Sequence, residues 1–293
     1  MKHLVISLLL LLGFSAFADE TATEDQQMTA EEFMASLKPQ EGNITLPGNI
    51  VTMNLGDKFQ YLSPESAERL LVDAWGNPPG NETMGMVIPK SPSPLSAEGW
   101  GVVITYDQDG YVSDKDADDI DYDDLLDDMK EESAEANKER VKQGYGSMSL
   151  VGWAESPVYD KQTHKFYWAK EYNTDSEVNS LNYNIRVLGR KGVLVLNAVA
   201  GMDQISLIKN EMPDLVAVTD FTKGNRYEEF NESTDHVAEY GLAALVAGGV
   251  AAKMGLFAKL GVLLLAFKKF LIIGVVAFFA LIGKLFKGKN KTE

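Results

Sequence analysis

Apolar and polar residues alternate in short segments through the middle of the chain, a pattern typical of β-strands. The clearest strand is WGVVITY at 100–106, which is apolar enough to be buried. Residues 181–188 and 193–200 are joined by the turn sequence GRKG and predict a β-hairpin. Residues 156–165 are expected to form a turn. Shorter strands are predicted at 42–46, 50–54, 59–62, 84–88, 149–154, 166–172 and 215–221.

Apolar residues three and four positions apart predict helices between these strands. Thr29 and Glu32 have the spacing of a capping box, and Ser63 followed by Pro64 is typical of a helix start. Asp203 is expected to cap a short helix that Pro213 ends. The predicted helices cover residues 30–37, 64–75, 121–143 and 203–211.

Strands in hairpins, together with a few covering helices, predict an α+β domain with a mostly antiparallel sheet. The long helix before a run of antiparallel strands resembles the element order of the PsbP-like α/β/α sandwich. This resemblance concerns element order alone, and a fold does not determine a function.

The first 18 residues, MKHLVISLLLLLGFSAFA, have the features of a secretory signal peptide. A lysine precedes an apolar run, and small residues stand at the expected cleavage site, so the mature chain would begin at Asp19. The run is short for a membrane span, which makes an uncleaved anchor the weaker alternative.

The chain is apolar again from about residue 241 to residue 286, and all the charged residues of this region are lysines. Three segments compete as a membrane span: 237–258, 260–283 and 270–283. The second is about 36 Å long as a helix, enough for a hydrocarbon core of about 30 Å. Its Leu, Ile, Val and Phe residues favour insertion by about 5 to 10 kcal/mol, against a cost of about 5 to 7 kcal/mol for Lys268 and Lys269.

A single crossing with the basic tail in the cytoplasm agrees with the positive-inside rule. A two-helix hairpin and a helix lying on the membrane surface are the alternatives. Ala244, Gly248 and Ala252 are four residues apart and would share a helix face that permits self-association. The common occurrence of Ala and Gly in membrane helices is the plainer explanation. The expected organisation is a signal peptide at 1–18, an acidic domain at 19–235 and a C-terminal anchor at 236–293.

Composition removes several classes of function. The chain has no cysteine, which excludes disulfides, thiolate metal sites and cysteine nucleophiles. Its net charge of −16 argues against nucleic acid as a partner. The acidic residues are concentrated between the two ends, and 107–139 alone holds fifteen of them beside three lysines. Such a stretch is ordinarily a solvated surface, although it also favours cationic partners or divalent ions.

Residues 105–116, TYDQDGYVSDKD, match part of a calcium-binding loop. Asp107, Asp109 and Asp116 fall where oxygen ligands are expected, and Gly110 falls at the sharp turn. The loop begins with Thr, ends with Asp in place of Glu, and follows a strand where a helix is usual. An ordinary Asp-Gly turn is the alternative explanation.

Other catalytic chemistry has little support in the sequence. His164 lies in a predicted turn beside Asp160 and would be the general base of a hydrolase, but a histidine on a surface turn is usually inert. No nucleophile elbow, phosphate loop or dinucleotide fingerprint is present. The aromatic residues Trp100, Trp153, Tyr167 and Trp168 are expected in the core.

Four segments carry a resemblance to a known family: GWGVVITYDQDGYVSD at 99–114, LVGWAES at 150–156, YWAKE at 167–171 and LNYNIRVLGRKGVLVLNAVAGM at 181–202. With the C-terminal GLAALVAGGVAAK and LFAKLGVLLLAFKKF, the chain resembles a bacterial family of membrane-anchored proteins with an exported domain of unknown function. The resemblance implies a Gram-negative envelope protein that is held in the inner membrane, with its exported domain in the periplasm. It implies no activity and no catalytic residues.

The expected function is therefore a non-catalytic envelope protein whose periplasmic domain binds another envelope protein. A calcium sensor using Asp107, Asp109 and Asp116 is the alternative, and a hydrolase around His164 is a third, weaker hypothesis. No cofactor other than calcium is expected.

Overall fold

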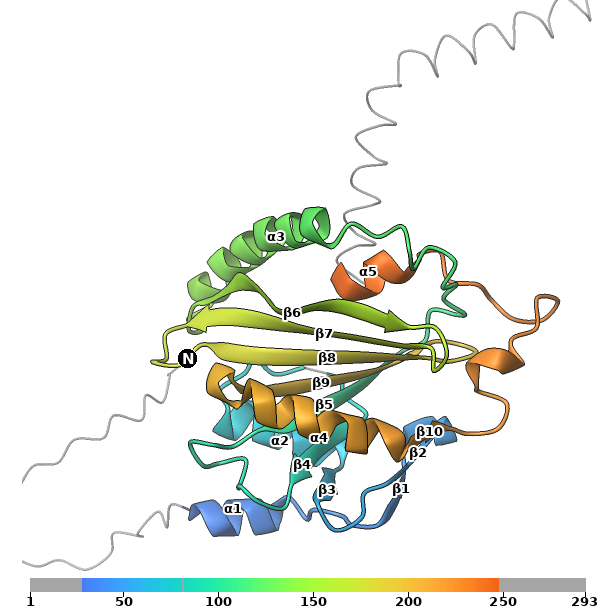
Figure 1. The fold of residues 1–293 in the computed structure, drawn as a ribbon. Helices are drawn as coiled ribbons and strands as arrows, with labels where there is room; N and C mark the ends of the chain where they lie inside the picture. The colour runs from blue at the N-terminus through green and yellow to red at the C-terminus, as the bar shows by residue number, and fades with distance from the viewer. Residues whose placement is uncertain (1–27, 81, 248–293) are drawn as a thin grey trace, which may run out of the picture.

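A computed structural model describes residues 28–80 and 82–247. Its largest element is a seven-stranded antiparallel sheet with the order β3-β4-β5-β9-β8-β7-β6 (Figure 1). The seven strands are β3 (Phe59–Leu62), β4 (Gly85–Pro89), β5 (Gly101–Asp107), β6 (Met148–Asp160), β7 (Lys165–Thr174), β8 (Ser180–Leu188) and β9 (Val193–Gly201). The predicted hairpin is confirmed, since β8 and β9 pair along their whole length.

A small antiparallel sheet of three strands adjoins the large one. It has the order β1-β2-β10, formed by β1 (Asn43–Thr45), β2 (Val51–Asn54) and β10 (Thr219–Phe221). The strand β10 comes from the C-terminal half of the domain and joins two strands from its beginning, so this sheet ties distant parts of the sequence together.

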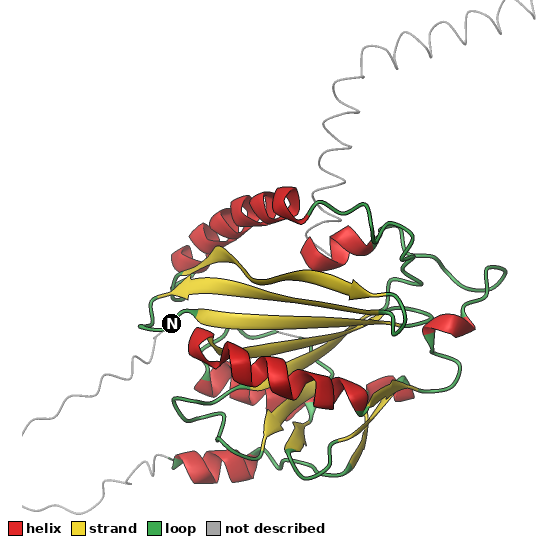
Figure 2. Ribbon diagram, viewed as in Figure 1, coloured by secondary structure: helices red, strands yellow, loops and turns green. Residues whose placement is uncertain are grey.

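Helices cover both faces of the large sheet (Figures 1 and 2). On one face lies α4 (Ile205–Ala217), and on the other lie α3 (Tyr122–Lys142) and α5 (Leu242–Ala247). The short α1 (Ala30–Ser36), α2 (Pro64–Arg69) and the π-helical turn η2 (Leu70–Ala74) pack near β3 and β4. The predicted α+β class with antiparallel sheets is confirmed.

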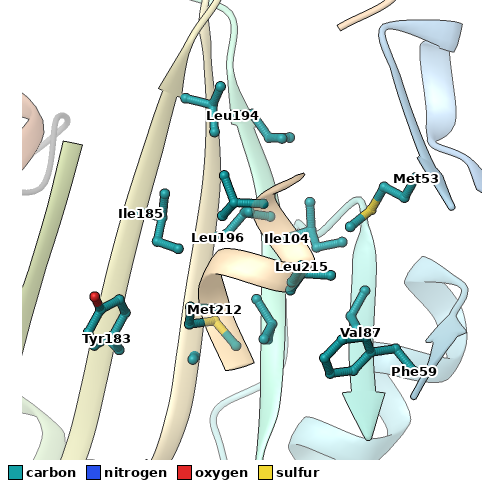
Figure 3. Close-up of a cluster of buried hydrophobic side chains, with 14 of the residues drawn as sticks. Met53, Phe59, Val87, Ile104, Tyr183, Ile185, Leu194, Leu196, Met212 and Leu215 are labelled. Carbon is teal, nitrogen blue, oxygen red and sulfur yellow. The ribbon is translucent and has the colours of Figure 1, made fainter. Parts of the chain in front are cut away.

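The apolar core is divided by the sheet into two main clusters. One lies between the large sheet, α4 and the small sheet, and Figure 3 shows side chains from all three meeting there. Met53, Ile104, Leu196, Met212 and Leu215 in this cluster are at most 1% exposed. The second cluster lies beneath α3 and α5 on the opposite face. Strand alternation explains the division, because neighbouring residues of one strand serve opposite clusters.

Some predicted boundaries were wrong. The turn expected at 156–165 is mostly strand, because β6 continues to Asp160 through three irregular positions in its pairing with β7. The helix expected to begin at Asp203 and stop before Pro213 begins after Gln204 and continues to Ala217, which shortens the strand expected at 215–221 to Thr219–Phe221. Its buried residues Ile208, Met212, Leu215 and Val216 are spaced as one helical face, and this packing outweighs the cost of an exposed proline.

The packed domain continues beyond Asp235, where the sequence analysis placed its end. Leu242, Leu245 and Val246 of α5 are buried in the second cluster. Among the helices that the structure describes, none is long and apolar enough to cross a membrane. The predicted signal peptide and most of the predicted anchor, with Gly248 and Ala252, lie outside the described residues.

Candidate functional site

The face of the large sheet turned away from α4 carries an unusual number of polar side chains. In β8, Leu181, Tyr183 and Ile185 belong to the apolar cluster under α4. The alternate residues of β8 therefore point to the opposite face. These residues are Asn182, Asn184 and Arg186.

The pairing of neighbouring strands gathers more polar groups on this face. Lys170 of β7 is directly opposite Asn182, and Asn197 of β9 is directly opposite Asn184. Directly opposed residues have Cβ atoms about 5 Å apart. Two cationic and three amide side chains therefore form one patch across three strands. We call Lys170, Asn182, Asn184, Arg186 and Asn197 the polar floor.

A cavity of about 630 Å³ lies over part of this floor. Asn182 and Asn197 line it together with Thr105 of β5, and Leu71 and Trp75 form an apolar wall. An adjoining cavity of about 1010 Å³ lies between α3 and the strands β6 and β7. Met148 lines both cavities, and Lys170 lines the second.

Several buried polar atoms in and beside the floor have no hydrogen-bond partner within the described part of the chain. They are Oδ1 of Asn182, Oδ1 of Asn197, Nε of Arg186 and the indole Nε1 of Trp168. An unpaired buried polar atom costs about 1 to 3 kcal/mol, so native proteins ordinarily satisfy such atoms with protein groups, water or a ligand. Asn182 and Asn197 line the cavity, although these two oxygens are themselves buried beneath its surface.

The two cations of the floor are removed from water. Burial, together with the positive charge of Arg186, lowers the pKa of Lys170 to about 8. Burial also lowers the pKa of Arg186 to about 10, partly opposed by the carboxylate of Asp107. The guanidinium of Arg186 lies 4.9 Å from the centre of the Trp168 ring. Within the described residues Lys170 forms no salt bridge, so its charge is available to an anion.

His164 lies elsewhere, in the turn between β6 and β7. Its Nδ1 is 3.3 Å from the hydroxyl of Tyr159 and 3.5 Å from a carboxylate oxygen of Asp114. The carboxylate beside His164 is thus Asp114, whereas Asp160 accepts hydrogen bonds from Gln162 and Thr163. Among the described residues His164 has no serine, threonine or lysine side chain in hydrogen-bond contact. The hydroxyl in contact with His164 is that of Tyr159, which donates its own hydrogen bond to Asp114 at 2.8 Å.

Stacked aromatic rings surround this histidine. Its ring lies 4.1 Å from that of Tyr227, and Tyr111 stacks on Tyr227 and on Phe230 with ring centres 4.5 and 3.9 Å apart. Burial, with the Tyr111 hydrogen bond and the nearby Asp114 carboxylate, raises the pKa of Tyr227 above its ordinary value. The cluster holds the loops at one end of the sheet together.

The acidic residues of the predicted calcium loop are engaged within the domain. A carboxylate oxygen of Asp109 accepts a hydrogen bond of 2.9 Å from the hydroxyl of Tyr240, and Asp116 accepts one of 3.1 Å from the backbone N–H of Leu242. Across residues 28–80 and 82–247, no three His, Asp or Glu side chains are placed together to hold a metal ion. The structure thus does not gather Asp107, Asp109 and Asp116 as ligands, and calcium binding stays a prediction.

The expected core role of the tryptophans is confirmed for Trp100 and Trp168, which are 2% and 1% exposed. Sequence reasoning missed the polar floor. Its asparagines and Arg186 alternate with apolar residues, and such a pattern is indistinguishable from a strand with one solvated face. Only the pairing of β7, β8 and β9 brings the floor together.

Fold and cavity together define an α+β domain with a partly polar cavity on one face of its sheet. The chain belongs to the family described as a protein of unknown function, DUF2167, which matches residues 38–279. No curated protein matches it.

One solved structure with some similarity is the solution structure of cyanobacterial PsbP (CyanoP) from Synechocystis sp. PCC 6803. It is 12% identical, covers 61% of this chain and 91% of its own, and superposes with a TM-score of 0.34. A superposition this loose supports no argument about fold or function, so the PsbP-like architecture stays an expectation.

Proposed function

We propose that this chain is an exported, membrane-anchored envelope protein whose periplasmic domain binds a ligand and does not catalyse a reaction. The observation that carries the proposal is the cavity over the polar floor, where the buried oxygens of Asn182 and Asn197 lack hydrogen-bond partners. Amides and unpaired cations are groups that recognise a polar molecule. The signal-like sequence at 1–18 and the apolar segment at 260–283 support export and anchoring.

Native mass spectrometry of the full-length protein, purified in detergent from its own membranes, tests the binding function. We expect a bound molecule on the wild-type protein that is absent from Asn197→Leu, because leucine fills part of the cavity and removes the amide. The matched control is Asn210→Leu, at an exposed position on α4. Equal spectra for all three proteins would contradict binding in this cavity. Release of a chemically altered molecule would contradict the non-catalytic function.

Reporter fusions test the topology. Alkaline phosphatase fused after Ala247 should be active, and a fluorescent protein fused after Glu293 should fluoresce, because the first folds only in the periplasm and the second in the cytoplasm. An active phosphatase at both positions would indicate a two-helix hairpin. Release of the protein from membranes at high pH would indicate a helix on the membrane surface.

Two partners expected from the sequence belong to the same proposal. Another envelope protein would bind the acidic domain, and a second copy would associate through Ala244, Gly248 and Ala252. Crosslinking in intact cells tests both, and recovery of the monomer alone would contradict them.

A further inference from the structure

The cavity of about 1010 Å³ beside α3 is a groove with an apolar floor. It lies between α3 and the strands β6 and β7, and Met129, Met148, Leu150 and Tyr172 line it. On α3 the lining residues recur three or four positions apart from Met129 to Gln143, so they form one side of that helix. At about 1.5 Å per residue, this side is about 21 Å long.

The helix α5 leads into this groove. Its first residue, Leu242, donates from its backbone N–H to a carboxylate oxygen of Asp116 at 3.1 Å, six residues before α3 begins. Its last residue, Ala247, lines the groove together with Met129, which lies in the second turn of α3. The helix α5 therefore advances beside α3 in the same direction (Figure 1), and the residues after Ala247 are directed along the groove.

The next segment of the sequence has the composition to fill an apolar groove. Residues 248–258 read GGVAAKMGLFA, with small and apolar residues around the single charge of Lys253. Small residues allow one backbone to approach another closely. In a helix that continued α5, Lys253 would lie on the same side as Val246, which it follows by seven residues. That side faces the domain, because Val246 is buried.

The groove also offers a negative charge to Lys253. Three glutamates of α3 line it beside the cations Arg140 and Lys170. Two of these glutamates form ion pairs with lysines of α3. Glu132 forms none within the described residues. Lys253 would lie about 9 Å beyond Ala247 along a helix, in the direction that leads past Glu132.

We propose that residues 248–258 continue α5 and occupy the groove beside α3, with apolar side chains on its floor and Lys253 paired with Glu132. The occupant is thus a segment of this same chain. The proposal goes beyond the binding function above and does not depend on it, because Asn182 and Asn197 line the other cavity.

A docked segment would also decide between the competing membrane spans. With residues 248–258 held by the domain, the segment 237–258 would not be free to enter a membrane. The segment 260–283 follows directly and would be the span. The docking would leave open the different helix side expected to allow self-association, which is formed by Ala244, Gly248 and Ala252.

Engineered disulfides in the full-length protein, purified in detergent, test the docking on a chain that has no native cysteine. Ala136→Cys, at an exposed position in the groove lining, is combined with one cysteine at each position from 250 to 257, and each protein is oxidised. A disulfide needs Cα atoms within about 7 Å of each other. We expect intramolecular disulfides at positions three or four residues apart, identified by mass spectrometry of unreduced peptides.

Two further cysteines control the experiment. Ala134→Cys is the matched control, because Ala134 is exposed on α3 but does not line the groove, and it should give about 10-fold less disulfide. Glu139→Cys lies in the lining about one turn further along α3 than Ala136→Cys. With Glu139→Cys, the positions that react should move by about one turn toward the C-terminus.

The products also identify any other occupant. Disulfides that join two chains would show that a second copy fills the groove, and they would overturn the proposal. The absence of disulfides at every position, with both Ala136→Cys and Glu139→Cys, would show that residues 248–258 lie elsewhere. Equal yields with Ala134→Cys and Ala136→Cys would equally overturn it, because they would indicate random collisions.

Charge reversal tests the proposed ion pair. Lys253→Glu should lower the disulfide yield of the best-reacting pair by about 2- to 5-fold, as expected for loss of an exposed ion pair. Glu132→Lys in the same chain should restore the yield, because the two charges are then exchanged. A yield that Lys253→Glu leaves unchanged, or that Glu132→Lys fails to restore, would overturn the pairing of Lys253 with Glu132.

Discussion

At the scale of single residues, the ionic groups of this domain divide into those that are paired internally and those that are not. Arg190 and Asp235 are the clearest internal pair. Arg190 donates from Nε and Nη2 to the two oxygens of Asp235 at 2.6 and 2.9 Å, and the Asp235 side chain is only 5% exposed. This two-point contact joins the β8–β9 turn to the loop before α5.

The Arg190–Asp235 pair predicts a specific pH dependence of stability. Hydrogen bonds from Arg190 hold the pKa of Asp235 at about 2, below its ordinary value of 3.8. A carboxylate with a lowered folded-state pKa stabilises the fold fully above its unfolded pKa, and this stabilisation is lost as the pH falls from about 4 to about 2. Asp235→Asn should therefore lower the free energy of unfolding at neutral pH, and its difference from wild type should shrink over that range.

Urea unfolding at several pH values measures this difference. Asp220→Asn is the matched control, because Asp220 is exposed on β10 and its replacement should leave the pH profile as it is. A difference between Asp235→Asn and wild type that is constant from pH 7 to about pH 2 would contradict the assigned role of the pair.

The hydrogen bond between Asp109 and Tyr240 leads to a prediction that distinguishes a structural role of Asp109 from calcium binding. Its bond to the Tyr240 hydroxyl anchors the segment before α5, and losing a hydrogen bond to a charged group costs about 1.5 to 3 kcal/mol in other proteins. Because the bond is partly exposed, Asp109→Ala should destabilise by about 1 kcal/mol, equally in EDTA and in about 1 mM calcium. A calcium-specific rise in melting temperature of the wild type, lost in Asp109→Ala, would instead favour the sensor.

At the scale of elements, the sequence predicts well those segments whose pattern has a local cause. The capping box of Thr29 and Glu32 is present at α1, and Asp121 caps α3 as the pattern 121–143 indicates. The paired strands β8 and β9 follow from their alternation and the turn between them. In each case the signal lies within a few residues of the structure it predicts.

The elements that were missed depend on contacts distant in sequence. The strand β6 runs through Pro157 because β7 pairs with it on one side, and its irregular register accommodates the proline at the sheet's outer strand. The polar floor depends on the pairing of three strands. A single-sequence pattern does not show which strands are neighbours, so its residues could not be brought together from the sequence.

The helix α4 tests whether packing against distant residues outweighs a helix-breaking proline within the helix. Pro213 is exposed and lacks the N–H that would bond to the carbonyl of Lys209, while the buried face of α4 keeps the helix continuous. Pro213→Ala should stabilise the domain by about 1 to 2 kcal/mol. Alanine is favoured over proline inside a helix, and this gain is partly offset because the unfolded chain without the proline has more conformational freedom.

Chemical denaturation of Pro213→Ala measures this gain. The comparison is Pro64→Ala, in the first turn of α2, where a proline has no helical hydrogen bond to lose and its replacement should give little or no gain. An unchanged or lower stability for Pro213→Ala would show that the proline is required at this position for a reason other than packing.

At the scale of the whole molecule, the two faces of the large sheet differ in polarity. The face under α4 is a closed apolar core, whereas the opposite face is apolar only beneath α3 and α5 and polar where the cavity lies. The small sheet closes the first face, and α5 helps to close the second. The proposed binding function would thus lie on the side of the sheet opposite the main apolar core.

The contacts of α5 predict that the folded domain extends beyond Asp235. Residues 236–238 pair with Tyr111, whose N–H donates to the carbonyl of His236 at 2.8 Å and whose carbonyl accepts from Ala238 at 2.9 Å. Leu242, Leu245 and Val246 then place at most 1% of their surface in solvent. Fully burying such side chains contributes about 1.5 to 3 kcal/mol each.

A chain of residues 19–247 should therefore fold more stably than one of residues 19–235, by roughly 5 kcal/mol or more in urea unfolding. Leu245→Ala in the longer chain should reproduce part of this loss and lower stability by about 2 to 5 kcal/mol, because it leaves a cavity in the second cluster. Ala243→Ser, on the same helix but only half-buried, should change stability little. Equal unfolding midpoints for the two chains would mean that α5 contributes nothing to the domain and that the fold is complete at Asp235. The expected result instead makes α5 part of the folded domain, packed against the same face of the sheet that carries the polar floor.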